Sequence, residues 1–460
     1  MKKGILFLLI LIVMFSCKNN SPENQKGIAD YAITNVTLID GTGNKAAPNT
    51  TILIKGEKIF DIVDSNAEIQ ADSIINGTGK FIIPGIFDNH FHLGEDNDRR
   101  LKRMIHFGVT NVFIPGSSFM TYPIVKRLDS IEKTGKVTSP SIKYSSLFVT
   151  VPDGHPRGDY RIEGKNIYRL RSEEEIPVIV KEAKENGAIA IKLMIEDGPT
   201  PPFIEIIDST LINRIRKEAD KAGLMLFAHI GERKEWKISL EHNVDALMHF
   251  TNPSIDWEND MDLVKQMQTD SIYWVTTGML IAAYTRYPLN PEWLDSEHWK
   301  VYDREREELK KNQEKHRQIA ISIIENGFRM SVEEFQNGYL KKIASDWRKL
   351  DSLGVQMVVG TDGGTPNLYN IPGLNVHKEM QLYQEGGMKP ERIIKCASLN
   401  AAKMLKIDKD YGSVEIGKIA NMLVLDKNPL DDISNTLSIN TVLKKGKIQK
   451  RITNANNGYK

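Results

Sequence analysis

Two histidines, His90 and His92, stand one residue apart directly after the apolar run FIIPGIF. Successive side chains of a β-strand point to opposite faces, so both imidazoles would lie on one side of a strand end while Phe91 faces the other way. A neutral imidazole nitrogen is a good ligand for zinc and similar ions. The spacing therefore predicts a metal site, although an isolated pair of this kind is more often simply solvated.

Four more potential ligands stand within or at the carboxyl ends of short apolar runs. They are Lys192 in AIAIKLMI, His229 in LMLFAHI, His249 in ALMHF and Asp362 in VQMVVGTDGG. Helical stretches separate most of these runs, and strand, helix, strand is the order of a parallel sheet. If that sheet closes into an eight-stranded barrel, the carboxyl ends of its strands share one mouth. Ligands far apart in sequence would then meet there.

The chain is long enough for such a barrel. Its 460 residues exceed the roughly 250 that one barrel needs, which leaves room for a second domain and an insertion. An α/β fold is expected, with barrel strands at about residues 81–92, 108–115, 142–150, 188–195, 224–230, 246–250, 271–277 and 356–362.

Several longer motifs occur in the same order as the potential ligands. They are TNVTLIDGTG (34–43), GTGKFIIPGIFDNHFHLG (77–94), GVTNVFIPG (108–116) and YGSVEIGKIANMLVLDKNPL (411–430). The ordered set resembles the amidohydrolase superfamily of metal-dependent hydrolases. GAIAIKLMIEDG (187–198) resembles the branch that includes imidazolonepropionase-related enzymes and prolidase-like peptidases.

The resemblance implies a particular domain organisation. Residues 81–412 would form a TIM-like (β/α)8 barrel, and residues 30–80 and 413–460 would join into one small β-sandwich beside it. The segment of about 278–354 is much longer than a single crossover and is rich in aromatic residues, then strongly helical. It is expected either to form a lid or substrate wall at the mouth, or to pack on the flank of the barrel.

The resemblance also implies a metal centre with two ions, expected to be zinc, with manganese, iron or cobalt as alternatives. One ion would be held by His90, His92 and Asp362, and the second by His229 and His249. Lys192 would bridge them only as a carboxylated lysine, because a protonated ammonium has no lone pair to give. The alternative is a lysine that reaches the mouth and binds substrate as a cation.

Two such ions would activate a shared water and polarise a substrate carbonyl. Asp362 is expected to take the proton from that water and return it to the leaving group, and His249 is counted with it as catalytic. Candidates for substrate binding are His155 and Arg157 in the loop after the third strand, and Tyr284. Arg161 and Arg286 are further candidates for the cation that would bind a substrate carboxylate.

The predicted activity is hydrolysis of a carbon–nitrogen bond in a small amide, cyclic amide or dipeptide-like molecule. A lactonase or esterase that uses the same metal site is the nearest alternative, because fold alone does not choose the substrate. A lipid-anchored binding protein without turnover, or an isomerase, is a further alternative.

The first residues predict export. Met1, Lys2 and Lys3 precede an apolar run that ends in Ser16 and Cys17, which resembles a bacterial lipoprotein signal with residues 1–16 removed. Cys17 would carry the lipid, and residues 17–29 would tether the enzyme to a membrane of the cell envelope, facing the periplasm or the surface. The alternative is an ordinary cleaved signal or an uncleaved anchor.

The charge and the cysteine content of the chain limit the binding partners that are expected for it. Sixty-one basic residues balance sixty acidic ones, for a formal net charge of +1, so no broad field attracts nucleic acid. The only other cysteine, Cys396, lies in a predicted helix without a nearby histidine and is expected to be a core residue. A small-molecule substrate and the membrane are the expected partners, and a homo-oligomer is compatible with the sequence.

Overall fold

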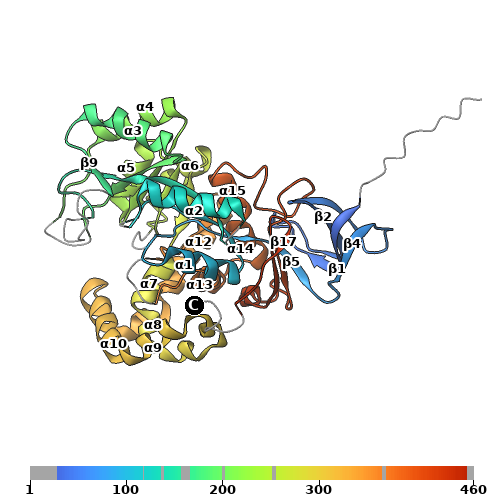
Figure 1. Cartoon of the computed structure of the whole chain (residues 1–460). Helices are drawn as coiled ribbons and strands as arrows, with labels where there is room; N and C mark the ends of the chain where they lie inside the picture. Colours follow the sequence, from blue (N-terminus) through green and yellow to red (C-terminus); the bar gives the residue numbers. More distant parts are fainter. Residues whose placement is uncertain are drawn as a thin grey trace, which may run out of the picture.

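The computed structural model of the chain describes residues 28–117, 119–135, 139–156, 166–198, 203–250, 255–364 and 369–452. Two sheets dominate it, one barrel-like and parallel, the other built from strands of both chain ends. Figure 1 shows the terminal sheet, in blue and red, on one side of the barrel. Residues Cys17, Arg157 and Arg161 lie outside the described residues.

The predicted (β/α)8 barrel is confirmed. Its strands follow one another in parallel in the order β14-β13-β12-β11-β10-β8-β7-β6, and a short strand, β9 (Ile167–Arg169), pairs with β8. The barrel strands are β6 (Ile86–Asp88), β7 (Val109–Ile114), β8 (Ser141–Thr150), β10 (Ala190–Ile195), β11 (Met225–Ile230), β12 (Ala246–Met248), β13 (Tyr273–Thr276) and β14 (Gln356–Val359).

The first and last strands meet just beyond their carboxyl ends. The Asn89 amide donates to the Val359 carbonyl at 3.3 Å, and Phe91 forms a parallel bridge with Gly363. These contacts bring the segment after β6 beside the segment after β14. The barrel is therefore nearly closed at the end where the candidate ligands lie.

One strand prediction was wrong. A single strand over residues 81–92 was expected, but the run divides at Gly85 into β5 (Phe81–Pro84) and β6. β5 pairs antiparallel with β15 (Met422–Leu425) in the terminal sheet, while the Gly85 amide donates to the Asn421 carbonyl. A Cβ at Gly85 would lie 2.3 Å from Thr110 Oγ1, so only glycine allows the close approach at this change of sheet.

Helices cover the outside of the barrel and bury their apolar faces against the strands. They are α1 (Asn97–His106), α2 (Tyr122–Thr134), α3 (Ile176–Glu185), α4 (Ser209–Ala222), α5 (Arg233–Glu241), α6 (Met261–Thr269), α13 (Leu374–Glu385) and α14 (Pro390–Cys396). A further helix, α15 (Leu399–Met404), instead packs with the buried side chains of the barrel interior. Cys396 is a free, fully buried residue at the end of α14, as predicted.

The two-residue period of the strands determines which side chains point into the barrel. Ala190 and Phe227 pack with residues of α15 in a buried apolar cluster. Lys192 and His229 each follow one of these two residues by two positions, so they point to the same side of the sheet. Apolar side chains therefore fill the barrel interior below, and the polar residues Lys192 and His229 lie above them, nearer the mouth.

The terminal sheet joins both ends of the described chain, as predicted. Its order is β17-β16-β15-β5-β1-β2-β3, with β4 paired to β1, and a bridge between Lys58 and Ile419 turns it back on itself. A shared core holds it together, including Ile33, Ile54 and Met422. The remaining strands are β1 (Ala29–Leu38), β2 (Ala47–Lys55), β3 (Lys58–Asp64), β4 (Ala71–Asn76), β16 (Ile439–Lys444) and β17 (Lys447–Ile448).

The segment between β13 and β14 is helical. It contains α7 (Gly278–Tyr284), α8 (Arg286–Leu289), α9 (Asp303–Lys311), α10 (Gln313–Ser322), α11 (Val332–Glu334) and α12 (Leu340–Ser352), with π-helical turns at Ile323–Gly327 and Phe335–Tyr339. Trp299 and Tyr302 are fully buried in it. Arg103 of α1 contacts Glu305 at 2.6 Å and ties the segment to the barrel. Much of this insertion is thus core rather than lid.

Across the described ranges, helices that combine the length and the apolar character needed for a membrane span are absent.

Candidate active site

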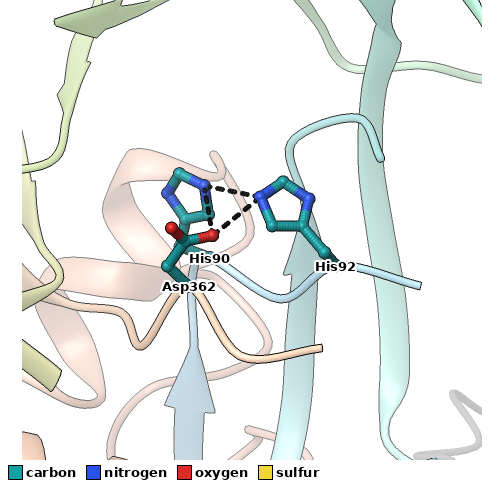
Figure 2. Close-up of side chains that lie close together, drawn as sticks. All are labelled: His90, His92 and Asp362. Atoms are coloured by element: carbon teal, nitrogen blue, oxygen red, sulfur yellow. Dashed lines mark hydrogen bonds and ion pairs between the residues drawn. The ribbon is translucent and has the colours of Figure 1, made fainter. Parts of the chain in front are cut away.

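Three side chains from the two joined strand ends converge on one point at the mouth (Figure 2). His92 Nε2 lies 3.2 Å from His90 Nε2 and 2.8 Å from Asp362 Oδ1. His90 Nε2 lies 3.6 Å from the same carboxylate oxygen. The three atoms form a small triangle of potential metal-ligand atoms.

The triangle has the right size for a metal ion. Ligand atoms placed about 2.0–2.1 Å from a zinc ion at tetrahedral angles would lie roughly 3.4 Å apart. The three separations in the structure, 2.8, 3.2 and 3.6 Å, bracket that value. Two imidazoles and a carboxylate are also the ligand types that divalent transition metals prefer. These residues therefore fit a bound metal ion.

Outer contacts orient two of the histidine rings. His92 Nδ1 lies 2.7 Å from the Gly116 carbonyl oxygen, so this nitrogen donates and Nε2 presents its lone pair to the site. His249 Nδ1 lies 2.9 Å from Thr277 Oγ1, which leaves its Nε2 available. Burial holds the pKa of His249 well below its usual value, so the ring is neutral and can act as a ligand.

A second group of donors lies beside the first. His155, Glu196 and His229 bring three potential ligand atoms within 4.8 Å of one another. The His229 ring stacks on His155 with centroids 4.8 Å apart and meets the His249 ring at 4.5 Å. Since the His249 and His90 ring centroids are 4.4 Å apart, His249 links the two groups. The mouth thus has donors enough for two ions.

Lys192 is buried at the floor of this mouth, with 1% of its surface exposed. Its Nζ has no hydrogen-bond partner in the part of the chain that the structure describes. Burial lowers the pKa of Lys192 to about 7, which Asp362 opposes. A large fraction of the amine is therefore neutral near pH 7, and a buried polar atom without a partner indicates a missing group.

Backbone strain marks two of the candidate ligands. His249 has a φ of 79° and Asp362 a φ of 54°, a region that residues other than glycine seldom adopt. Asn370 Nδ2 donates to the carbonyl oxygens of Thr361 and Asp362, which holds this turn. Such strain is concentrated at functional sites, where the surrounding structure stabilises it.

The donors line a cavity of about 650 Å³, within the range of small-molecule sites. His155 and Tyr284, two predicted substrate contacts, both face it. Arg286 is not among its described lining residues. It lies in α8 and forms an ion pair with Glu385 at 2.9 Å, so it is already engaged on the protein surface.

Glu196 was missed by the sequence reasoning. It is the first residue after β10, and its carboxylate makes a short contact with His229 Nε2 and lies 3.7 Å from His155 Nε2. Burial raises the pKa of Glu196 and its contact with His229 lowers it, to about 2 overall. Its position at a strand end, four residues after Lys192, was the available signal.

The barrel and its histidine-rich mouth define a hydrolase of the (β/α)8 class. The sequence model of the Amidohydrolase family matches residues 81–449, most of the chain. The chain therefore belongs to the amidohydrolase family, as its motifs predicted, and is a hydrolase that acts on carbon–nitrogen bonds.

Individual relatives are distant. The chain is 20% identical to a 5-methylthioadenosine/S-adenosylhomocysteine deaminase of Thermoanaerobacter pseudethanolicus over 82% of this chain and 80% of the deaminase. It is 22% identical to the imidazolonepropionase of Christiangramia forsetii over 92% and 98%. The crystal structure of a Xaa-Pro dipeptidase with bound methionine superposes with a TM-score of 0.68 at 19% identity, covering 91% of this chain and 99% of that one. At such identities the structural likeness establishes the fold.

Proposed function

We propose that this protein is a metal-dependent amidohydrolase that cleaves a carbon–nitrogen bond in a small amide, cyclic amide or dipeptide-like molecule. The observation that carries the proposal is the triangle of His90, His92 and Asp362 atoms, whose separations suit one divalent ion. The unpartnered amine of Lys192 beside it supports a second ion.

In this proposal His90, His92 and Asp362 would hold one ion, His229 and His249 would hold the other, and a carboxylated Lys192 would serve as a ligand to both. A divalent ion at this place supplies Lewis acidity that activates water and polarises a carbonyl group. The neutral Lys192 amine adds to carbon dioxide and loses a proton, which turns it into a carboxylate-like ligand. That modification would account for a buried lysine whose Nζ has no hydrogen-bond partner among the described residues.

Asp362 is proposed to carry the proton. Its Oδ1 lies 2.8 Å from His92 Nε2 and 3.6 Å from His90 Nε2, and the residue lines the cavity through which an attacking water would enter. The carboxylate takes a proton from that water and delivers it to the leaving nitrogen. Burial lowers the pKa of His155 to about 4, so this ring is neutral and is proposed to donate a hydrogen bond to the substrate.

The test is the metal content per chain of protein purified without chelators, measured by elemental analysis beside a Lys192→Ala variant. About two ions per chain in the parent, with a sharp drop in the variant, support the bridged centre. About one ion in both proteins would contradict the bridge and make Lys192 a substrate-binding residue. A parent without bound metal, even after incubation with zinc, would refute the proposal as a whole.

A further inference from the structure

One wall of the cavity is apolar and takes no part in holding metal. It is formed by Leu280, Ile281 and Tyr284 of α7, together with Ile323 and Phe328. All of these residues come from the segment between β13 and β14, far in sequence from the predicted ligands His90 to His249. We call this set the insertion wall.

The insertion wall is held in place from behind. The Phe328 ring packs against Phe335 at 5.5 Å and Tyr339 at 4.8 Å, and those two rings stack on each other at 5.0 Å. The buried Glu379 carboxylate accepts the amides of Gly278 and Met279 at 3.1 and 2.7 Å, which fixes the start of α7. A wall supported in this way keeps the cavity open, and preorganisation lowers the cost of binding.

Two large aromatic residues at the cavity are left partly in solvent. Tyr284 of the insertion wall is 40% exposed and Phe119, from the loop after β7, is 46% exposed. Apolar surface in water is unfavourable, and burying it beneath a ligand of similar character releases that cost. Exposed aromatic groups at the rim of a pocket therefore favour an apolar ligand.

We propose that the insertion wall binds a bulky apolar group, aryl or branched alkyl, attached next to the bond that is cleaved. The substrate class is then an amide with a large hydrophobic substituent. The cavity of about 650 Å³ has room for such a group beside the donors of the mouth. The inference rests on the proposed function, because the metal ions place the scissile bond.

The test uses two hydroxamates, which chelate zinc with the same head but carry different tails. Acetohydroxamate reports on the metal centre alone, whereas 4-phenylbutanohydroxamate adds an aryl tail. Isothermal titration of the zinc-loaded protein is expected to show at least about tenfold tighter binding of the phenyl compound, because the wall removes its aromatic ring from water.

Two wall variants then locate the tail. Leu280→Ala and Phe328→Ala remove half-buried side chains from different elements of the insertion wall, so their effects on folding are independent. Each is expected to remove most of the gain from the phenyl tail and to leave acetohydroxamate affinity within about twofold. Ile319→Ala is the matched control, because Ile319 is 44% exposed on α10 of the same segment and is not a described cavity residue.

The outcomes separate the two proposals. Equal affinities for both hydroxamates in the parent, or a phenyl gain that survives both wall substitutions, would overturn the inference while the metal site stands. A parent that binds neither hydroxamate when incubated with zinc would overturn the proposed function and the inference with it.

Discussion

The Asp88 carboxylate joins the two strand ends that carry the first candidate metal site. Its Oδ2 accepts the Thr361 hydroxyl at 2.7 Å, and its Oδ1 accepts the Thr361 amide at 3.1 Å and the His90 amide at 3.2 Å. Asp88 and Thr361 are 273 positions apart in the sequence. Asp88 therefore fixes the backbone beside His90 and the backbone beside Asp362 in one network.

Asp88→Asn is expected to weaken zinc binding by about 10- to 100-fold, as loss of such supporting contacts does at other metal sites. One carboxylate oxygen becomes an NH₂ group, which cannot accept from Thr361. The Thr361 hydroxyl also accepts the Gly363 amide at 3.0 Å, so the substitution removes the acceptor of the hydroxyl hydrogen and the hydroxyl must reorient while it holds Gly363. Competition with a chelator of known zinc affinity measures the effect.

Thr361→Ser is the matched control for Asp88→Asn. It keeps the hydroxyl that donates to Asp88 and accepts from Gly363, so zinc affinity is expected to stay close to that of the parent. Parent-like zinc binding by Asp88→Asn would show that the network does not position the ligands.

Asp362→Asn is expected to abolish turnover and leave a folded protein. Asparagine tolerates a left-handed backbone better than other residues that have a Cβ, so the φ of 54° is retained without added strain. The amide cannot carry the proton that the proposed mechanism assigns to this position. Turnover on a panel of dipeptides and N-acyl amino acids is measured beside circular dichroism of the variant.

Full activity of Asp362→Asn would contradict the mechanism. The companion variant Asp362→Ala places a Cβ without a polar side chain in the same strained turn. It is expected to have a lower melting temperature than Asp362→Asn, because alanine pays more for a positive φ.

Lys192→Met is expected to keep or raise the stability of metal-free protein while reducing its metal content. No described hydrogen bond to Nζ is lost, and a buried amine is replaced by an apolar side chain of similar length, which removes the cost of desolvating it. Thermal unfolding in the presence of a chelator measures the first effect and elemental analysis measures the second. A marked drop in melting temperature would show that Lys192 has a structural role.

Glu379 is expected to make stability depend on pH. It is fully buried at the start of α7, and burial raises its pKa from 4.5 to about 7, against hydrogen bonds from Thr276, Met279 and Gly278. A carboxyl whose folded pKa is raised stabilises the fold fully below the unfolded pKa of 4.5, and this contribution is lost as pH rises through about 7. The parent should therefore lose stability between these values.

Glu379→Gln isolates that dependence. The amide side chain of this variant does not titrate. It offers one fewer acceptor to the backbone amides, which changes the melting temperature by an amount that does not depend on pH. The melting temperature of the variant minus that of the parent is expected to become more positive from about pH 5 to about pH 8. A difference that does not change over this range would show that Glu379 is not protonated in the folded protein near neutral pH.

The strand pattern predicted a parallel sheet, because apolar runs at strand spacing specify which faces are buried, and the resemblance of the motifs to a known family predicted that this sheet closes into a barrel. The strand prediction failed at residues 81–92. The apolar run continues through Gly85, but the residues before Gly85 belong to the terminal sheet and those after it to the barrel. Pro84 followed by Gly85 is a local break signal, but it does not show that the two apolar halves belong to different sheets, since that depends on their partners, β15 and β7, elsewhere in the sequence.

The insertion between β13 and β14 also shows what the sequence alone could not predict. Its aromatic residues suggested a substrate wall, yet Trp299 and Tyr302 are fully buried, whereas Tyr284 and Phe328 line the cavity. Composition predicts that aromatic side chains will be buried, but not whether protein or ligand will cover them.

The sequence by itself determined the types of the candidate ligands, their order and their places at strand ends, because these follow from residue chemistry and from the two-residue period of a strand. Only the tertiary structure decided that Glu196 joins His155 and His229, and that Asp88 binds Thr361. Those contacts depend on the closure of the barrel, which brings chain segments together through the packing of every strand between them rather than through any local pattern.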